Sequence, residues 1–149
     1  MTGGYTGKIL RIDLTRKSIG TIHTEQYEEY GGGHGIGSAI FWDLAGDQLP
    51  FDALDPRNVV TIMTGPFSGV LVPSAAGRCE VQGLGPQPYP IEWFTRSNFG
   101  GCFSSQLKYA GWDGIVVTGA VPGADDPVWV NIINDKVTIE NARTLWGMD

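Results

Sequence analysis

The sequence has few charged residues and only two cysteines. Charged residues make up 17% of the 149 positions, against an average of about 25% for soluble domains. We therefore expect a partner or a further domain to cover part of the surface. Cys79 and Cys102 cannot by themselves supply a four-cysteine zinc or iron–sulfur site. Two buried thiols are expected in preference to a disulfide, which needs an oxidising compartment.

Long apolar runs and an excess of positive charge are also missing. No run of eighteen apolar residues occurs, so no membrane span is predicted. The N-terminus has no basic region followed by an apolar one, which argues against a signal peptide and favours a cytoplasmic location. The formal net charge of −6 argues against nucleic acid as the main ligand, because phosphate contacts need clustered Lys and Arg.

The length and the glycine content favour one turn-rich globular domain. A chain of 149 residues buries roughly two-thirds of its unfolded surface. Its 22 glycines, about twice the usual ~7%, are scattered among strand-like runs. Helical segments are predicted at 26–30, 38–44 and 103–110, and prolines predict loops at 46–57 and 83–90. Strands are predicted at 8–14, 18–24, 58–64, 91–95, 113–119, 127–133 and 136–140. The pattern predicts a β-rich α+β single domain without a βαβ rhythm.

A glycine-rich run at 31–37 does not match a dinucleotide-binding fingerprint. No register of this run gives G-x-G-x-x-G, and the residues before it are acidic and polar, unlike a buried strand. We therefore expect a turn that packs close under another backbone. His34, within the run, is expected to be a hydrogen-bonded turn residue in preference to a ligand-facing group.

The stretch 96–113 combines a polar pair, a double glycine and a short helix. Such a helix start favours an anion, Gly100 and Gly101 let a ligand approach the backbone, and the Asn98 amide can serve a phosphate or Mg²⁺. By itself the stretch favours the simpler interpretation, in which Asn98 caps the helix and the glycines make a turn. Arg78, after three small residues, can grip a phosphate in a bidentate fork. The alternative for Arg78 is a salt bridge to Glu80 or Glu92.

An ordered set of motifs carries a family resemblance over nearly the whole chain. The motifs are Gly32-Gly33-His34-Gly35-Ile36, Phe51-Asp52-Ala53-Leu54-Asp55-Pro56-Arg57-Asn58, Thr64-Gly65-Pro66-Phe67-Ser68-Gly69, Gly77-Arg78, Ser97-Asn98-Phe99-Gly100-Gly101, Gln106-Leu107-Lys108-Tyr109-Ala110-Gly111-Trp112-Asp113 and Leu145-Trp146-Gly147. This order closely resembles the N-terminal domain of the tungsten-containing aldehyde ferredoxin oxidoreductase family.

The resemblance implies a β-rich base for a tungsten or molybdenum bis-pterin cofactor (tungstopterin). Carried over residue by residue, it implies that Arg78 contacts the pterin and that Gly100 lies against the cofactor. It also implies that Asn98 helps to hold a Mg²⁺ that bridges the two pterin phosphates. The family usually has arginine where His34 stands and glutamate where Gln106 stands, and the segment between Arg78 and Asn98 is longer here. These departures bear on the substrate class and on the grip on the cofactor.

The resemblance further implies that residues 1–149 are a base domain incomplete at its C-terminal end and inactive alone. The family's 4Fe–4S cluster and substrate-side acid and base lie in further domains. Family members oxidise aldehydes to carboxylates with water and pass electrons to ferredoxin, whereas one relative reduces the ring of an aromatic thioester. The chain is then a fragment or a split-gene subunit whose partners are those domains. A homo-oligomer is a further hypothesis, and a free-standing, non-enzymatic pterin-binding or assembly module is the alternative.

Overall fold

A six-stranded mixed sheet forms the centre of the molecule. The computed structural model describes residues 3–73, 77–87, 90–123 and 126–148. The strands are β1 (Lys8–Asp13), β2 (Ser18–His23), β3 (Val59–Thr64), β4 (Cys79–Gly85), β5 (Trp93–Phe99) and β6 (Gly114–Thr118), in the order β2-β1-β6-β3-β4-β5. The β1–β6 pair is parallel and the other pairs are antiparallel. The remaining elements are β7 (Val128–Ile133) paired with β8 (Lys136–Asn141), α1 (His34–Ala45), α2 (Phe103–Tyr109), and the 3-10 helices η1 (Thr24–Tyr30) and η2 (Gly46–Gln48).

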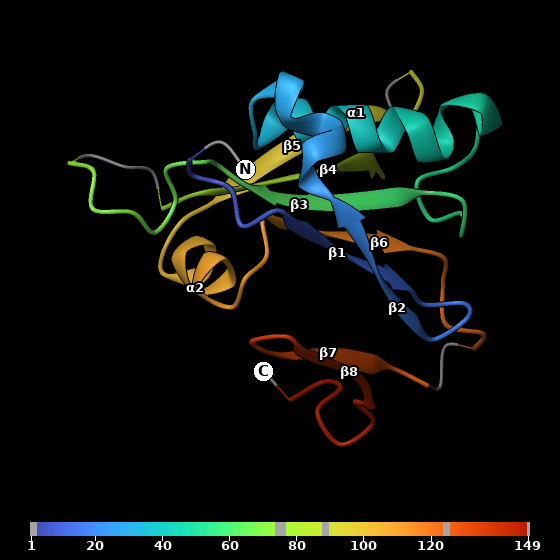
Figure 1. The fold of residues 1–149 in the computed structure, drawn as a ribbon. Helices are drawn as coiled ribbons and strands as arrows, with labels where there is room; N and C mark the ends of the chain where they lie inside the picture. Colours follow the sequence, from blue (N-terminus) through green and yellow to red (C-terminus); the bar gives the residue numbers. More distant parts are fainter. Residues whose placement is uncertain (1–2, 74–76, 88–89, 124–125, 149) are drawn as a thin grey trace.

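Both faces of the sheet are covered. Helix α1 lies on one face, and α2 with the β7–β8 hairpin lies on the other (Figure 1). The alternation of side chains along β1 supplies both cores, because Ile9 packs in the cluster under α1 while Leu10 and Ile12 pack in the opposite cluster. Two adjacent apolar residues at the start of β1 are therefore the expected pattern for a strand buried on two sides.

A buried ion pair ties the N-terminal segment to α2 and β6. Lys108 Nζ lies 2.6 Å from Asp113 Oδ1, and both side chains are buried. The Asp113 carboxylate also accepts hydrogen bonds from the backbone N–H groups of Thr6 (2.9 Å) and Gly7 (2.8 Å) and from Thr24 Oγ1 (2.6 Å). A buried carboxylate is tolerated where its oxygens are paired in this way, so this cluster fixes where the chain enters the sheet.

The predicted fold class and most of the predicted elements are confirmed. The structure is a β-rich α+β domain, and the hairpin predicted at 127–140 is present as β7–β8, with Asn134 at a φ of 55° in its turn. The loop predicted at 83–90 is wrong at its beginning, because β4 continues to Gly85. A Cβ at Gly83 would lie 2.9 Å from the Val59 carbonyl oxygen, so a glycine occupies a paired strand position there for close packing.

The glycine-rich run behaves as predicted, although the helix after it starts earlier. A Cβ at Gly32 would lie 2.8 Å from Pro66 Cδ, which confirms that the run packs close under another segment. Helix α1 begins at His34, not at Ser38. Despite its low intrinsic propensity, glycine at position 37 is required inside this helix, because the helix axis passes close over the sheet there.

The prediction of two buried thiols is half wrong. Cys79 is fully buried, and burial raises the pKa of its thiol. Cys102 is exposed, because it stands at the start of α2, where the chain leaves the sheet. Both cysteines are free thiols.

Candidate functional site

The end of the β4–β5 pair brings the three predicted site residues together. Asn98 lies on β5, and the ladder ends where Cys79 of β4 stands opposite Phe99 of β5. Beyond that last pair, Arg78 directly precedes β4 and Gly100 directly follows β5. Residues twenty positions apart in the sequence therefore meet at one edge of the sheet, as antiparallel pairing requires.

The helix predicted at 103–110 is confirmed as α2, but Asn98 does not cap it. Strand β5 continues through Asn98 to Phe99, and α2 begins only at Phe103. Cys102 is the N-cap residue, and no side chain makes a capping hydrogen bond there. The interpretation in which Asn98 caps this helix is therefore wrong. Asn98 is instead an exposed strand residue.

Arg78 does not form the salt bridge considered as its alternative. Glu80 pairs with Arg96, at 3.2 Å from Nη1 to Oε1, and Glu92 accepts a hydrogen bond from the backbone N–H of Ala53. Within the described part of the chain, no carboxylate forms an ion pair with Arg78, and its side chain is exposed. Its guanidinium is thus accessible to a ligand.

Gly100 is a glycine that the chain's own packing does not require. A Cβ built there would meet no atom within 4 Å, and its φ lies outside the left-handed region. Gly101, by contrast, has a φ of +91°, and its carbonyl oxygen lies 3.2 Å from the place where a Cβ of Gly77 would stand. An open position without a backbone reason for glycine fits the close approach of an external group. The donor set and this space together fit the phosphate-bearing cofactor and Mg²⁺ implied by the resemblance.

A buried polar cluster lies beside this site, on the face that α1 covers. Glu80 is 7% exposed, and its Oε1 lies 3.1 Å from His34 Nδ1 and 3.2 Å from Arg96 Nη1. Glu80 stands opposite Asn98 in the ladder, and directly paired residues point to the same face. The cluster therefore adjoins Asn98.

Gln82 connects His34 to the rest of the cluster. Its amide Nε2 lies 2.6 Å from His34 Nδ1, 3.1 Å from the His34 carbonyl oxygen and 3.2 Å from Ser38 Oγ, and its Oε1 accepts from Thr61 Oγ1 at 3.3 Å. His34 Nδ1 therefore lies between an amide donor and the Glu80 carboxylate, and its tautomer sets which of the two it bonds. His34 is hydrogen-bonded as predicted, but at a helix start.

Alternating polar residues on two strands are the sequence signal for this cluster, and it is missed when each residue is considered alone. Glu80 and Gln82 alternate along β4, and Arg96 and Asn98 alternate along β5. Polar residues at a period of two on paired strands predict a polar stripe on one face. The stripe becomes recognisable only when the pairing of the two strands is known.

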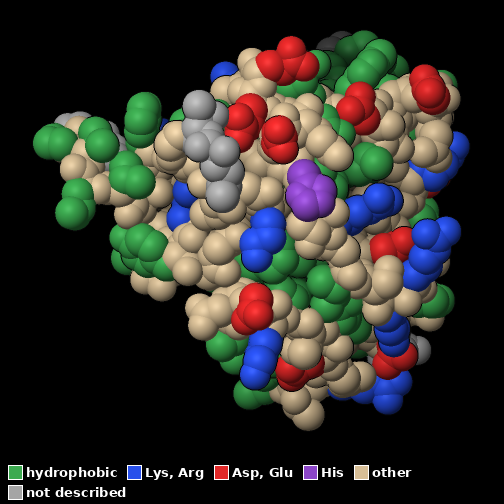
Figure 2. Space-filling model, viewed as in Figure 1, with side chains coloured by type: hydrophobic (Ala, Val, Ile, Leu, Met, Phe, Trp, Pro, Cys, Tyr) green, Lys and Arg blue, Asp and Glu red, His purple; other side chains and the backbone are tan. Residues whose placement is uncertain are grey.

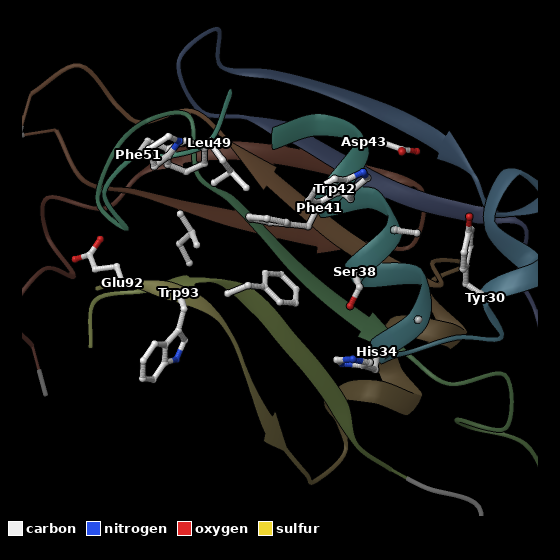
Figure 3. Close-up of a pocket in the computed structure, with 15 residues that line it drawn as sticks. Tyr30, His34, Ser38, Phe41, Trp42, Asp43, Leu49, Phe51, Glu92 and Trp93 are labelled. Atoms are coloured by element: carbon white, nitrogen blue, oxygen red, sulfur yellow. The ribbon is translucent and has the colours of Figure 1, made fainter. Parts of the chain in front are cut away.

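An apolar groove extends from the cluster along α1. It has a volume of about 810 Å³ and lies between α1 and the beginning of β5 (Figure 3). His34 and Ser38 line it along the helix, Phe41 and Phe94 pack against one another at 4.6 Å between ring centroids, and Trp93 points away from the helix. The groove is thus an apolar surface next to the polar cluster around Glu80.

A second apolar surface projects from the sheet on the loop between β3 and β4. Apolar side chains gather on this loop at the left of the molecule (Figure 2). Phe67 is 61% exposed and Leu71 is fully exposed, with Val70 and Val72 between 40% and 46%. Tyr109 of α2 anchors the base of the loop by donating to the Gly69 carbonyl oxygen at 2.9 Å. Such exposed apolar area agrees with the expectation that other protein covers part of this surface.

The described residues contain neither a helix that could cross a membrane nor a cluster of the usual metal-binding side chains. None of the helices there combines the length and the apolarity that crossing a bilayer would need. No three His, Cys, Asp or Glu side chains in the same ranges gather as metal ligands. The role predicted for Asn98 involves an amide oxygen, which is not one of these four donor types.

The chain is similar to several known proteins. The family model for the N-terminal domain of aldehyde ferredoxin oxidoreductase matches residues 9–149. The tungsten-containing aldehyde ferredoxin oxidoreductases of Thermococcus kodakarensis and Pyrococcus horikoshii are 37% and 36% identical over 97% of this chain, which covers 23% of each. A Pyrococcus furiosus aliphatic sulfonate oxidoreductase, WOR-like subunit, is 31% identical over 97% of this chain and 22% of its own length.

A solved structure shares the fold. The active site complex BamBC of benzoyl coenzyme A reductase, in complex with 1,5 dienoyl-CoA, superposes with a TM-score of 0.86 at 32% identity. The match covers 99% of this chain and 21% of that one. This chain thus spans less than a quarter of the relatives that it matches. It belongs to the aldehyde ferredoxin oxidoreductase family and corresponds to that family's N-terminal domain.

Proposed function

We propose that this chain is the N-terminal cofactor-binding part of a tungsten or molybdenum bis-pterin oxidoreductase. The observation that carries the proposal is the meeting of Arg78, Asn98 and Gly100 at one end of the β4–β5 pair. Two of them offer accessible polar groups, and the third leaves space against the backbone. Tungsten appears in the names of the relatives from Thermococcus and Pyrococcus.

Each of the three residues has a distinct role in holding the cofactor. The Arg78 guanidinium binds a phosphate or pterin oxygen through paired N–H donors. The Asn98 side-chain oxygen is a ligand for Mg²⁺, which prefers hard oxygen donors. Gly100 lets the ligand approach the main chain without a Cβ in the way. When bound, the cofactor supplies the redox chemistry, while the protein binds and orients it.

The activity proposed for the assembled enzyme is oxidation of an aldehyde to a carboxylate, with water as the oxygen source and ferredoxin as the electron acceptor. The short span of this chain against its relatives supports a division of labour. We propose that further domains hold a 4Fe–4S cluster and the substrate-side groups. The projecting β3–β4 loop is a candidate contact for those domains. A cytoplasmic location is part of the same proposal.

A second activity is supported by one observation. The benzoyl coenzyme A reductase complex matches the whole fold at a TM-score of 0.86. The alternative is therefore reduction of an aromatic acyl thioester by an enzyme with the same base domain. Assays of the assembled enzyme with an aldehyde and with an aromatic acyl thioester, each with a matched redox dye, separate the two activities.

Arg78→Gln and Asn98→Ala test the cofactor site directly. Each variant is expected to lower tungsten or molybdenum and pterin in the assembled enzyme by at least about tenfold. A hydrogen bond to a charged group contributes roughly 1.5–3 kcal/mol, and Asn98→Ala removes an oxygen ligand of Mg²⁺. Metal is measured by mass spectrometry and pterin by fluorescence after release. Arg16→Gln, at an exposed side chain in the turn between β1 and β2, is the control. Full metal and pterin in both variants would mean that these residues do not hold the cofactor.

Gly100→Ala separates ligand space from protein packing. Its free energy of unfolding is expected to change by less than about 0.5 kcal/mol, because the new Cβ meets nothing in the chain. The metal and pterin content of the assembled enzyme is expected to fall at least threefold. Gly101→Ala is the matched comparison, since its φ of +91° makes alanine cost about 1 kcal/mol of stability. Unchanged cofactor content in Gly100→Ala would contradict the role of this position.

A further inference from the structure

Arg96 is a cation beside the proposed cofactor site that the sequence motifs do not mark. It stands on β5 two residues before Asn98, so their side chains share one face of the strand. Same-face neighbours on a strand are about 7 Å apart. That separation is well within the reach of an arginine side chain toward a ligand held at Asn98.

Glu80 holds Arg96 on this face. Its Oε1 accepts from Arg96 Nη1 at 3.2 Å and lies 3.1 Å from His34 Nδ1. The Glu80 side chain is 8% exposed, whereas that of Arg96 is 60% exposed. Glu80 is itself fixed by the cluster around Gln82, which is fully buried. The arginine is thus anchored at one nitrogen and open at its other end.

The remaining donors of Arg96 are available for a ligand. A guanidinium carries five N–H groups, and the bond to Glu80 is the one hydrogen bond of Arg96 found among the described residues. The contact with Glu80 uses one nitrogen of the guanidinium, and the Arg96 side chain is 60% exposed, so its other N–H groups face outward. A fork of free N–H groups suits a phosphate oxygen.

We propose that Arg96 is a second anion-binding residue of the site formed by Arg78, Asn98 and Gly100. It contacts a phosphate-type group of the cofactor, and Glu80 acts as its positioning residue. This inference rests on the proposed function, since it concerns the same ligand. Arg96 adds a positive charge to the site, and the buried polar cluster holds that charge in position through Glu80. Hydrogen bonds therefore connect the interior of the domain with the ligand site.

The test measures cofactor content and stability separately in the assembled enzyme. Arg96→Gln is expected to lower metal and pterin per chain at least fivefold, and Arg96→Lys, which keeps the charge, is expected to retain about half. Glu80→Gln is expected to lower the content by a smaller factor. The double variant Arg96→Gln/Glu80→Gln is expected to match Arg96→Gln alone, because the glutamate acts through the arginine. Arg16→Gln is the control.

The outcomes distinguish this inference from the proposed function. Full cofactor in Arg96→Gln together with loss in Arg78→Gln would overturn the role of Arg96 and leave the proposed function standing. Full cofactor in all three of Arg78→Gln, Asn98→Ala and Arg96→Gln would overturn the proposed function itself. If Arg96→Gln lowers the melting temperature, the cofactor content of Arg96→Lys is used to separate charge from stability. An Arg96→Lys variant with the melting temperature of the natural sequence but the same cofactor loss as Arg96→Gln would also overturn the inference.

Discussion

Replacing Asp113 with alanine is expected to lower the free energy of unfolding by about 3–5 kcal/mol, the usual cost of removing one partner of a buried ion pair. The change leaves Lys108 Nζ buried with the Gly4 carbonyl oxygen at 2.6 Å as its remaining partner. It also strands the donors of Thr6 and Thr24. Urea unfolding followed by circular dichroism measures the loss.

Asp13→Ala is the control for this prediction. Asp13 pairs with Arg16 at 3.7 Å, and the arginine is 79% exposed, so the loss is expected to stay below about 1 kcal/mol. A similar small loss for Asp113→Ala would show that the cluster does not hold the N-terminal segment in solution.

The Asp113 carboxylate is also expected to make the free energy of unfolding depend on pH in the acid range. Burial alone would raise the pKa of Asp113, but hydrogen bonds from Lys108, Thr24 and Thr6 outweigh it and hold the pKa below its ordinary value of 3.8. Because the folded pKa is the lower one, the contribution is fully present above the unfolded value. It is lost as the pH falls below about 4 toward the folded pKa. Urea unfolding between pH 6 and 3 is expected to show a shallower acid dependence in Asp113→Asn than in the natural sequence.

Gly37→Ala is expected to be the second most damaging substitution. The added Cβ would stand 2.0 Å from Gln82 Oε1 and 2.7 Å from Thr61 Oγ1. Both are fully buried and bonded to one another, so neither side chain has space to move. Overpacking of this kind costs about 1–3 kcal/mol, measured by urea unfolding. Because Gln82 supports His34 and Glu80, cofactor content is expected to fall as well.

Gly20→Ala is the matched control for Gly37→Ala. A Cβ at Gly20 on β2 meets nothing within 4 Å, so the unfolding free energy is expected to change by less than about 0.5 kcal/mol. Equal stability of the two variants would show that α1 can shift away from the sheet. The cluster beside Asn98 would then not be rigid.

Local patterns in the sequence predicted most strands, because apolar alternation and turn residues are local signals. The hairpin across Asn134 is an example. The burial of β1 on both faces was not predicted from the same pattern, which is also typical of a half-buried strand. The extent of β4 could not be predicted this way, since Gly83 lies in it for a close approach to β3 that only the pairing reveals. The length of β5 could not be predicted for a different reason, since residues 95–98 are polar and do not give a strand pattern.

The sequence predicted Arg78, Asn98 and Gly100 as cofactor-binding residues chiefly through the family resemblance. Residue chemistry alone made Arg78 a candidate for binding a phosphate but favoured a capping role for Asn98. That capping role was wrong, because a polar residue before a double glycine suits a helix cap as well as a strand end, and Asn98 lies on β5. The Glu80–Arg96 pair joins two strands, so no sequence window contains it.

The strand order also determines when the sheet can be completed. Strand β6 lies between β1 and β3, and Ile9 stands opposite Gly114. Strands β3, β4 and β5 pair with their sequence neighbours and can form early, whereas the N-terminal hairpin stays detached until β6 has left the ribosome. Such long-range closure slows folding and exposes unpaired strand edges in the meantime. The strands that carry Arg78 and Asn98 are therefore built before the element that joins them to the beginning of the chain.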